Sequence, residues 1–186
     1  MQKDELWVFL KAHNVPLQRW GKGEAKTLDH LLAEITAGEA TLTEKQGRLV
    51  RLVEGATLNV YYSDGHTSWA LVEETQVFND GRSRTRDVVG IGEKMRLGED
   101  PKDCAYRALS EELGITEKLQ LVPKSLSTKG PVPSQSFPGL ESVYVTHIFD
   151  VFLPEHLYRP EGYKEKQSDK ISYFVWKKVS DTGAQR

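Results

Sequence analysis

The stretch from Gly92 to Ile115, GEKMRLGEDPKDCAYRALSEELGI, constrains the fold of this chain more than any other. Asp100 is a favourable helix N-cap, and Pro101 suits the first helical position because its missing N–H is not needed there. Gly114 suits the left-handed conformation that commonly ends a helix. The sequence therefore predicts a helix over residues 101–113, entered from a charged loop.

The faces of this predicted helix differ in chemistry. Ala105, Leu109 and Leu113 lie four residues apart and form an apolar stripe that should face the core. Glu111 and Glu112 are adjacent carboxylates, which repel each other unless solvent or a cation relieves the repulsion. Mg²⁺ prefers carboxylate oxygens together with phosphates and water, so the pair fits a metal site as well as a solvated acidic face.

The spacing of charges around the helix resembles the Nudix box, G-x5-E-x7-R-E-U-x-E-E-x-G-U, where U is a bulky aliphatic residue. The degenerate match covers residues 93–115, and the agreeing positions are Glu99, Arg107, Leu109, Glu111, Glu112, Gly114 and Ile115. Two positions depart from the pattern, because Glu93 stands where the box has its first glycine and Ala108 replaces the glutamate after the arginine. The resemblance indicates the family through one short motif.

The resemblance implies a fold and an activity. The expected fold class is α/β, a Nudix-type α/β/α sandwich with a mixed β-sheet. The expected protein is a Mg²⁺- or Mn²⁺-dependent hydrolase that cleaves a diphosphate linkage in a nucleoside diphosphate derivative. Such chemistry suits a divalent cation, which neutralises phosphate charge and lowers the pKa of a bound water molecule.

The resemblance also implies which carboxylates bind the metal. Glu111 and Glu112 on the helix are the first candidates, and Glu99 on the preceding loop is the third. Glu93 is a candidate replacement for the carboxylate that Ala108 lacks.

Three further positions complete the expected catalytic set beside Glu111 and Glu112. Arg107 is expected to orient one of the carboxylates by a charge-assisted hydrogen bond. Family enzymes often take the general base from a late loop, and here YRPEGYKEKQSDK supplies Glu161 and Glu165. The competing interpretation of that loop is a solvated, charged connection.

Ala108 keeps a second function open. A methyl group can neither bind a metal nor support a base, so the alternative is a Nudix-fold module that binds nucleotide or RNA without hydrolysis. A third candidate, isomerisation of a prenyl diphosphate, is the least favoured. It needs a cysteine and glutamate pair placed for proton transfer, and the single cysteine, Cys104, lies in the box helix.

The pattern of apolar residues changes near residue 56. Helical spacing in KDELWVFLKAH and TLDHLLAEITAG predicts a helical N-terminal extension over 1–55, packed on a Nudix domain over 56–186, although residues 40–55 fit helix or strand. Asp64-Gly65 and Asp80-Gly81 predict hairpins within an antiparallel meander over 57–92. Later strands are expected in 118–126, 140–154 and 170–180, with a long loop over 127–139.

Composition limits the partners. The 25 basic and 27 acidic residues among 186 give no general attraction to polyanions, so nucleic acid enters only as a substrate or ligand. One cysteine excludes an intrachain disulfide, and no apolar run approaches the ~20 residues that span a bilayer. We expect a soluble cytoplasmic protein with no membrane partner. Dimers are common in the resembled family, so a homodimer is also open.

Two sets of side chains have two interpretations each. Arg82, Arg84 and Arg86 alternate along a predicted strand, and they would either receive phosphates or protect an edge strand from aggregation. Aromatic side chains would either stack on a nucleobase or, more commonly, fill the core. The aromatic candidates are Trp20, Tyr61, Tyr62, Trp69 and Phe137.

Overall fold

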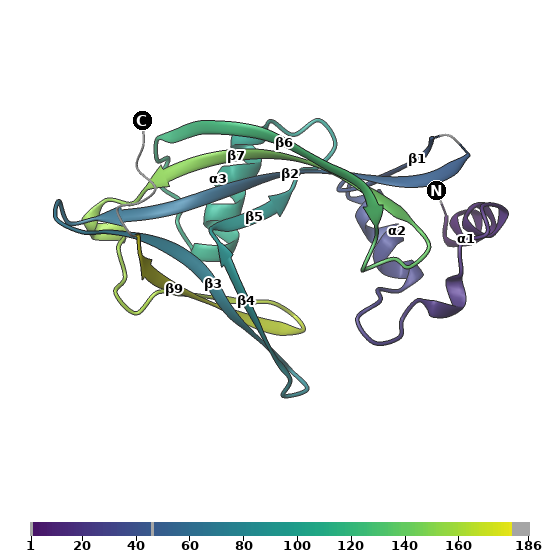
Figure 1. Cartoon of the computed structure of the whole chain (residues 1–186), viewed down its shortest axis with the longest axis horizontal. Coiled ribbons are helices and arrows are strands. Elements are labelled where there is room, and N and C mark those ends of the chain that lie inside the picture. The colour runs from purple at the N-terminus through teal and green to yellow at the C-terminus, as the bar shows by residue number, and fades with distance from the viewer. Residues whose placement is uncertain (1, 46, 180–186) are drawn as a thin grey trace. The chain divides into compact units, whose positions relative to one another are not determined.

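The computed structural model describes residues 2–45 and 47–179 and divides the chain into two compact units, each built from separate stretches (Figure 1). Unit 1 comprises Met1–Gly55, Lys94–Asp100 and Leu126–Thr146. Unit 2 comprises Ala56–Glu93, Pro101–Ser125 and His147–Arg186. The division into an extension over 1–55 and a domain over 56–186 stays a prediction.

Unit 1 combines short helices with strands. Its elements are α1 (Lys3–Ala12), the 3₁₀ turn η1 (Leu17–Arg19), α2 (Leu28–Thr36), β1 (Thr41–Lys45) and the first part of β2 (Arg48–Ser63). The two predicted helices are present, and β1 pairs antiparallel with β2, so the ambiguous residues 40–55 are mostly strand. Leu6, Leu10 and Leu31 are fully buried beside Trp20 and Phe137, which places these two aromatic residues in the core.

Unit 2 contains α3 and the larger part of the sheet. The remaining elements in chain order are β3 (Ser68–Phe78), β4 (Ser83–Val89), β5 (Ile91–Lys94), α3 (Pro101–Leu113), β6 (Leu121–Pro133), β7 (Glu141–Phe152), η2 (Glu155–Leu157), β8 (Tyr163–Lys166) and β9 (Lys170–Lys178). Of these strands, β6 and β7, like β2, have residues in both units. The helix predicted over 101–113 is confirmed. The hairpin turns at Asp64-Gly65 and Asp80-Gly81 are confirmed as well, since they join β2 to β3 and β3 to β4.

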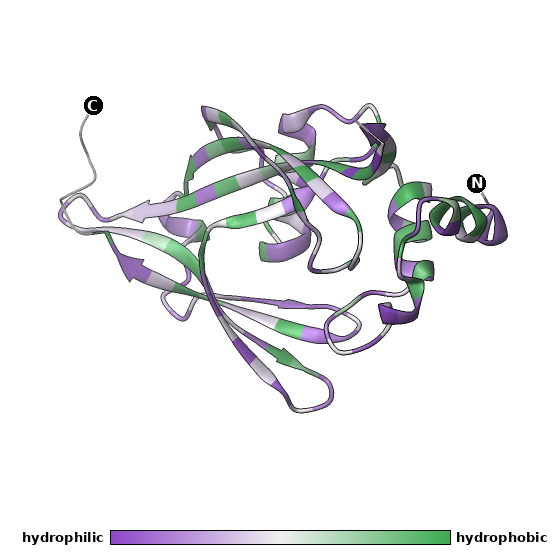
Figure 2. Cartoon of the chain, turned by 45° about the vertical axis from the view of Figure 1, so that its right-hand side comes forward, coloured by the Kyte–Doolittle hydropathy of each residue, from purple (hydrophilic) through white to green (hydrophobic). Residues whose placement is uncertain are grey.

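The strands form one hydrogen-bonded sheet in the order β6-β7-β2-β3-β9-β8, with β1 and β5 paired to β2 and β4 paired to β3. β3 runs antiparallel to β2, β4 and β9. Two contacts show that β7 runs parallel to β2. Asn59 Nδ2 donates to Asp150 Oδ1, and two residues further along β2 the Tyr61 carbonyl accepts from the N–H of Leu153, which directly follows β7. The fold class is therefore α/β with a mixed sheet, as predicted, and Figure 2 shows hydrophilic and hydrophobic residues alternating along the strands.

Two predicted loops are partly wrong. Residues 127–133 of the predicted loop 127–139 belong to β6, whose side chains are mostly exposed at the end of the sheet order. Proline is tolerated in such an edge strand, which explains why the proline-rich sequence suggested a loop. The predicted charged loop after β7 also contains a strand, β8, which pairs antiparallel with β9. No helix among the described residues is long and apolar enough to cross a membrane.

Candidate metal centre

Helix α3 carries the central acidic side chain of the site. Its buried face consists of Cys104, Ala105, Ala108, Leu109 and Leu113, so burial of the apolar stripe orients the whole helix. The helix ends where the Gly114 N–H donates to the Ser110 carbonyl at 3.1 Å, and it contacts β8. This packing turns one side of α3 toward the acidic strand residues of unit 2.

Glu112 is partly buried and is held by the backbone. Its Oε1 accepts a hydrogen bond from the Gly92 N–H at 3.1 Å. Burial raises the pKa of Glu112 to about 9, and the negative charges of Glu165, Glu93 and Glu73 also raise it, while the Gly92 N–H opposes them. Without a cation, Glu112 is therefore protonated at neutral pH.

Glu165 lies on β8 rather than in a loop, and it belongs to the same cluster. Burial raises the pKa of Glu165, and the charges of Glu93 and Glu73 act in the same direction. The Gln167 side chain, which donates to Glu165 Oε2 at 2.7 Å, and the Lys170 ammonium oppose the shift. The sequence analysis named Glu165, and the structure brings it together with Glu112.

Glu73 is a member of the cluster that the sequence analysis did not name. It lies on β3, is 8% exposed, and accepts hydrogen bonds from Gln76 Nε2 at 2.5 Å and from Arg86 Nε at 3.1 Å. A signal for it exists in the sequence: Leu71 and Glu73 lie two residues apart, so strand alternation puts this glutamate on the same face as a fully buried leucine.

Arg107 connects the box helix with Glu93 on β5. Its Nη1 lies 3.9 Å from Glu93 Oε1 and 3.5 Å from Glu111 Oε2, and its Nη2 lies 3.6 Å from Cys104 Sγ. Glu111 is half exposed, whereas Arg107 is mostly buried. Arg107 therefore lies within ion-pair distance of two of the predicted carboxylates, and its orienting role stays a prediction.

The other three positions discussed in the sequence have local surroundings of their own. Glu99 belongs to unit 1, where its Oε2 accepts a hydrogen bond from the Arg96 N–H at 2.8 Å. Glu161 is exposed in the turn before β8, and its charge acts on Tyr163. Ala108 is fully buried on α3, so no side chain at this position offers an oxygen to the cluster.

The carboxyl groups of the cluster are the type of donor that a hard divalent cation prefers. Within residues 2–45 and 47–179, no three acidic, histidine or cysteine side chains are placed to hold one ion together. Mg²⁺ usually takes only one or two protein carboxylates and fills its other positions with water and phosphate oxygens. Glu112 and Glu93 supply two such carboxyl groups, and a cation beside them would offset the burial and the neighbouring negative charges that raise the pKa of Glu112.

Comparisons with known proteins give structural likenesses only. No model of a known protein family matches the sequence, and the search of curated proteins finds no match. Similar solved structures include a MutT/nudix family protein from Enterococcus faecalis, with 15% identity and a TM-score of 0.49 over 84% of this chain and 53% of that one. The present chain therefore spans about half the length of the Enterococcus protein.

The names of two further similar structures state a ligand or an activity of those proteins. The NUDIX domain of Shewanella oneidensis NrtR complexed with ADP ribose has 9% identity and a TM-score of 0.44, over 66% of this chain and 70% of that one. The E. coli dihydroneopterin triphosphate pyrophosphohydrolase has 15% identity and a TM-score of 0.41, over 68% and 79%. At these identities and TM-scores, neither likeness establishes a function for this chain.

Proposed function

We propose that the protein is a Mg²⁺- or Mn²⁺-dependent hydrolase that cleaves a diphosphate linkage in a nucleoside diphosphate derivative, as its box-like motif implies. The proposal rests on the burial of Glu112 among other glutamates and on its raised pKa. This carboxyl group occupies a position matching the box, is partly buried, and has a pKa raised to about 9 beside three other glutamates. Strongly shifted carboxyl groups in an acidic cluster are typical of sites that bind cations or move protons.

The residues of the cluster have distinct roles in this proposal. A bound cation would supply charge neutralisation at the phosphates and a lowered pKa for a water molecule. Glu112, held by the Gly92 N–H, and Glu93 would bind it, and Arg107 would orient Glu111. Glu165 would be the proton acceptor, because burial raises its pKa and brings the carboxylate closer to the operating pH.

Other predicted residues have smaller parts in the proposal. Glu111 is already paired with Arg107, so its role is to support Arg107 as much as to bind metal. The metal-binding role of Glu99 and the catalytic role of Glu161 stay predictions. We further propose that the ligand is a nucleotide and that the protein is cytoplasmic.

The test is phosphorus NMR of product formation from a panel of compounds. The panel contains nucleoside triphosphates, ADP-ribose, NAD, sugar nucleotides, dinucleoside polyphosphates and capped RNA, each with Mg²⁺ or Mn²⁺. We expect turnover of at least one compound that requires the metal and is lost in Glu112→Gln. Turnover that survives in this variant would refute the site.

A matched pair of variants identifies the proton acceptor. Glu165→Gln should lower kcat strongly, by about 10²-fold or more as for other general bases, whereas Glu161→Gln should leave kcat within a few-fold. The reverse order would move the base to the exposed turn. Glu112→Gln, with its lost turnover, provides the inactive reference.

The buried Ala108 favours one second candidate, a module that binds nucleotide without hydrolysis. Such a module would be stabilised thermally by a compound of the panel, because a ligand that binds only the folded state raises the melting temperature. It would form no product in excess Mg²⁺ or Mn²⁺. That combination, in folded protein, would replace the hydrolase proposal.

A further inference from the structure

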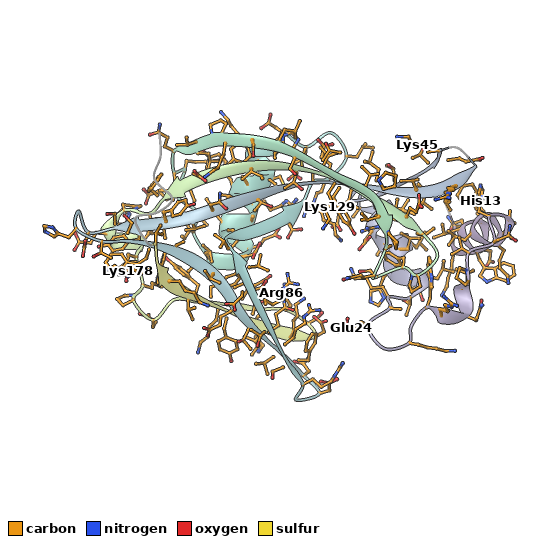
Figure 3. All side chains as sticks on the ribbon, viewed as in Figure 1. His13, Glu24, Lys45, Arg86, Lys129 and Lys178 are labelled. Carbon is orange, nitrogen blue, oxygen red and sulfur yellow. The ribbon has the colours of Figure 1, made fainter. Side chains whose placement is uncertain are left out.

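Strand β4 presents basic side chains beside the acidic cluster. The strand pairs with β3, and all its residues are exposed. Arg84 and Arg86 are two residues apart on it, about 7 Å along the strand. Both side chains reach the same buried pair, Glu73 and Gln76, although the β3–β4 register shifts beside Arg86. Figure 3 labels Arg86 beside β4.

Both arginines are anchored by a buried polar platform on β3 and β9. Arg86 Nε donates to Glu73 Oε2 at 3.1 Å, and Arg84 Nη2 donates to Gln76 Oε1 at 2.7 Å. Gln76 is 5% exposed and donates in turn to Glu73 Oε1 at 2.5 Å and to Ser172 Oγ at 3.4 Å. Apolar residues at these buried positions would often stabilise the sheet at least as well. Stability alone therefore does not explain the polar platform.

The platform uses only one nitrogen of each guanidinium group. A guanidinium carries five N–H donors in a planar fork, and Glu73 and Gln76 each accept from one nitrogen of their arginine. The Arg86 side chain is 36% exposed, so the rest of its fork reaches solvent. Held in one orientation and open on one side, such forks match phosphate oxygens bidentately.

Arg82 lies in the hairpin turn just before β4, and its hydrogen-bond partner differs from those of Arg84 and Arg86. Its Nε donates to Asp80 Oδ2 at 2.8 Å, and its guanidinium lies over the Phe78 ring at 5.3 Å, as that of Arg84 does at 5.8 Å. Its charge is therefore compensated within the hairpin turn. Arg82 has no link to the platform among the contacts described for residues 2–45 and 47–179, which makes it a natural control.

We propose that Arg84 and Arg86 form an anion clamp for the distal phosphates of a polyphosphate chain whose scissile linkage lies at Glu112 and Glu165. The clamp rests on the proposed hydrolase function and adds a substrate class to it: nucleotides with three or more phosphates, rather than nucleotide sugars with two. Since Arg86 bonds to Glu73 of the acidic cluster, one chain of phosphates would extend from the cluster to the arginines.

The shared hydrogen bond has a thermodynamic consequence. A phosphate on the free donors of Arg86 offsets the positive charge beside Glu73, so the acidic cluster attracts a cation more strongly. By linkage, a cation at the cluster should strengthen phosphate binding by the same factor.

The experiment is isothermal titration calorimetry of the full chain with inorganic triphosphate and inorganic pyrophosphate, in chelator and again with Mg²⁺. We expect triphosphate to bind in chelator, more tightly than pyrophosphate, and more tightly again with Mg²⁺. Arg84→Gln and Arg86→Lys should each weaken triphosphate binding by about tenfold or more, because each loses a charge-assisted fork. Arg82→Gln removes the same charge from the turn just before the strand and should change binding by less than about twofold.

Several results would overturn the clamp. Unchanged triphosphate binding in both variants, equal binding of pyrophosphate and triphosphate, or no binding at all in chelator would each do so. Tighter binding of a single-stranded RNA oligonucleotide than of triphosphate, with the same dependence on the two arginines, would assign the surface to nucleic acid instead. Failure of the hydrolase proposal would show separately, as absent turnover with triphosphate binding intact.

Discussion

Replacing Glu112 with glutamine should stabilise the protein when no divalent cation is present. The pKa of Glu112 is raised from 4.5 to about 9, so between these values the folded state holds a proton that the unfolded state has lost. The free energy of unfolding of the wild type must then fall as pH rises through this range. Glutamine is uncharged at all pH values and can still accept the Gly92 N–H through its amide oxygen.

The size of the effect follows from the shift. Each pH unit above about 4.5 lowers the free energy of unfolding of the wild type by about 1.4 kcal/mol. The loss therefore has an upper limit of about 4 kcal/mol at about pH 7.5. Because Glu112 is only partly buried, solvent screening reduces this, and we expect roughly 2 kcal/mol. For a chain of this length, that corresponds to a melting temperature about 4–8 °C higher in Glu112→Gln.

Thermal unfolding in chelator at about pH 5.5 and about pH 7.5 measures the difference. The advantage of Glu112→Gln should grow with pH by about 1 kcal/mol or more. Glu111→Gln is the matched control, because this neighbour is half exposed and paired with Arg107, so its change should stay within about 0.5 kcal/mol. Addition of Mg²⁺ should stabilise the wild type and close the gap. A less stable Glu112→Gln in chelator, or a difference independent of pH, would refute the reasoning.

Three other predictions follow from the burial or the charge of Glu34, Ala108 and Glu112. Glu34 is 5% exposed, and although burial raises its pKa, its neighbours Lys94, Arg51 and Lys26 lower it to about 2. Glu34→Gln should therefore reduce the free energy of unfolding in urea by about 3–5 kcal/mol at neutral pH, and wild type should lose this stabilisation as pH falls from about 4.5 toward 2. An equal loss in the half-exposed control Lys26→Gln would contradict this. Ala108→Glu should lower the urea midpoint in chelator by the equivalent of about 2 kcal/mol or more, because Ala108 is fully buried and a carboxylate there would lose its hydration one turn before Glu112. An unchanged midpoint would show that this position accepts a carboxylate. Mn²⁺ affinity, measured by calorimetry, should rise from about pH 5.5 to 8, because the raised pKa of Glu112 makes metal binding release a proton; affinity independent of pH would exclude Glu112 as a ligand.

Local signals in the sequence predicted the parts of the fold that depend on local physics. The helix over 101–113 is fixed by a proline that fits its first turn and a glycine that fits its end, and neither depends on distant contacts. The two Asp-Gly hairpins are local in the same sense. Glu112 could be chosen because the motif and the helix agree on where it lies.

The remaining parts depend on contacts between distant stretches. Whether 40–55 forms helix or strand is decided by pairing within the β1–β2 hairpin, and 127–133 is strand because it lies along β7. The role of Glu73 depends on strand register, which brings β3 beside β4 and β9. A sequence pattern gives the side of a strand but not its neighbours, so this carboxylate and its link to Arg86 needed the structure.

The discontinuous composition of unit 1 determines how the chain can be shortened. Residues 1–55 share that unit with Lys94–Asp100 and Leu126–Thr146, and the cut at residue 55 would fall inside β2. A truncation that keeps only residues 56–186 would therefore leave two internal segments without the residues that bury them, and would expose a fresh sheet edge to aggregation. Expression of the motif-bearing part alone should give insoluble protein, so a minimal version would have to be designed by shortening the hairpin 126–146 together with the N-terminal region.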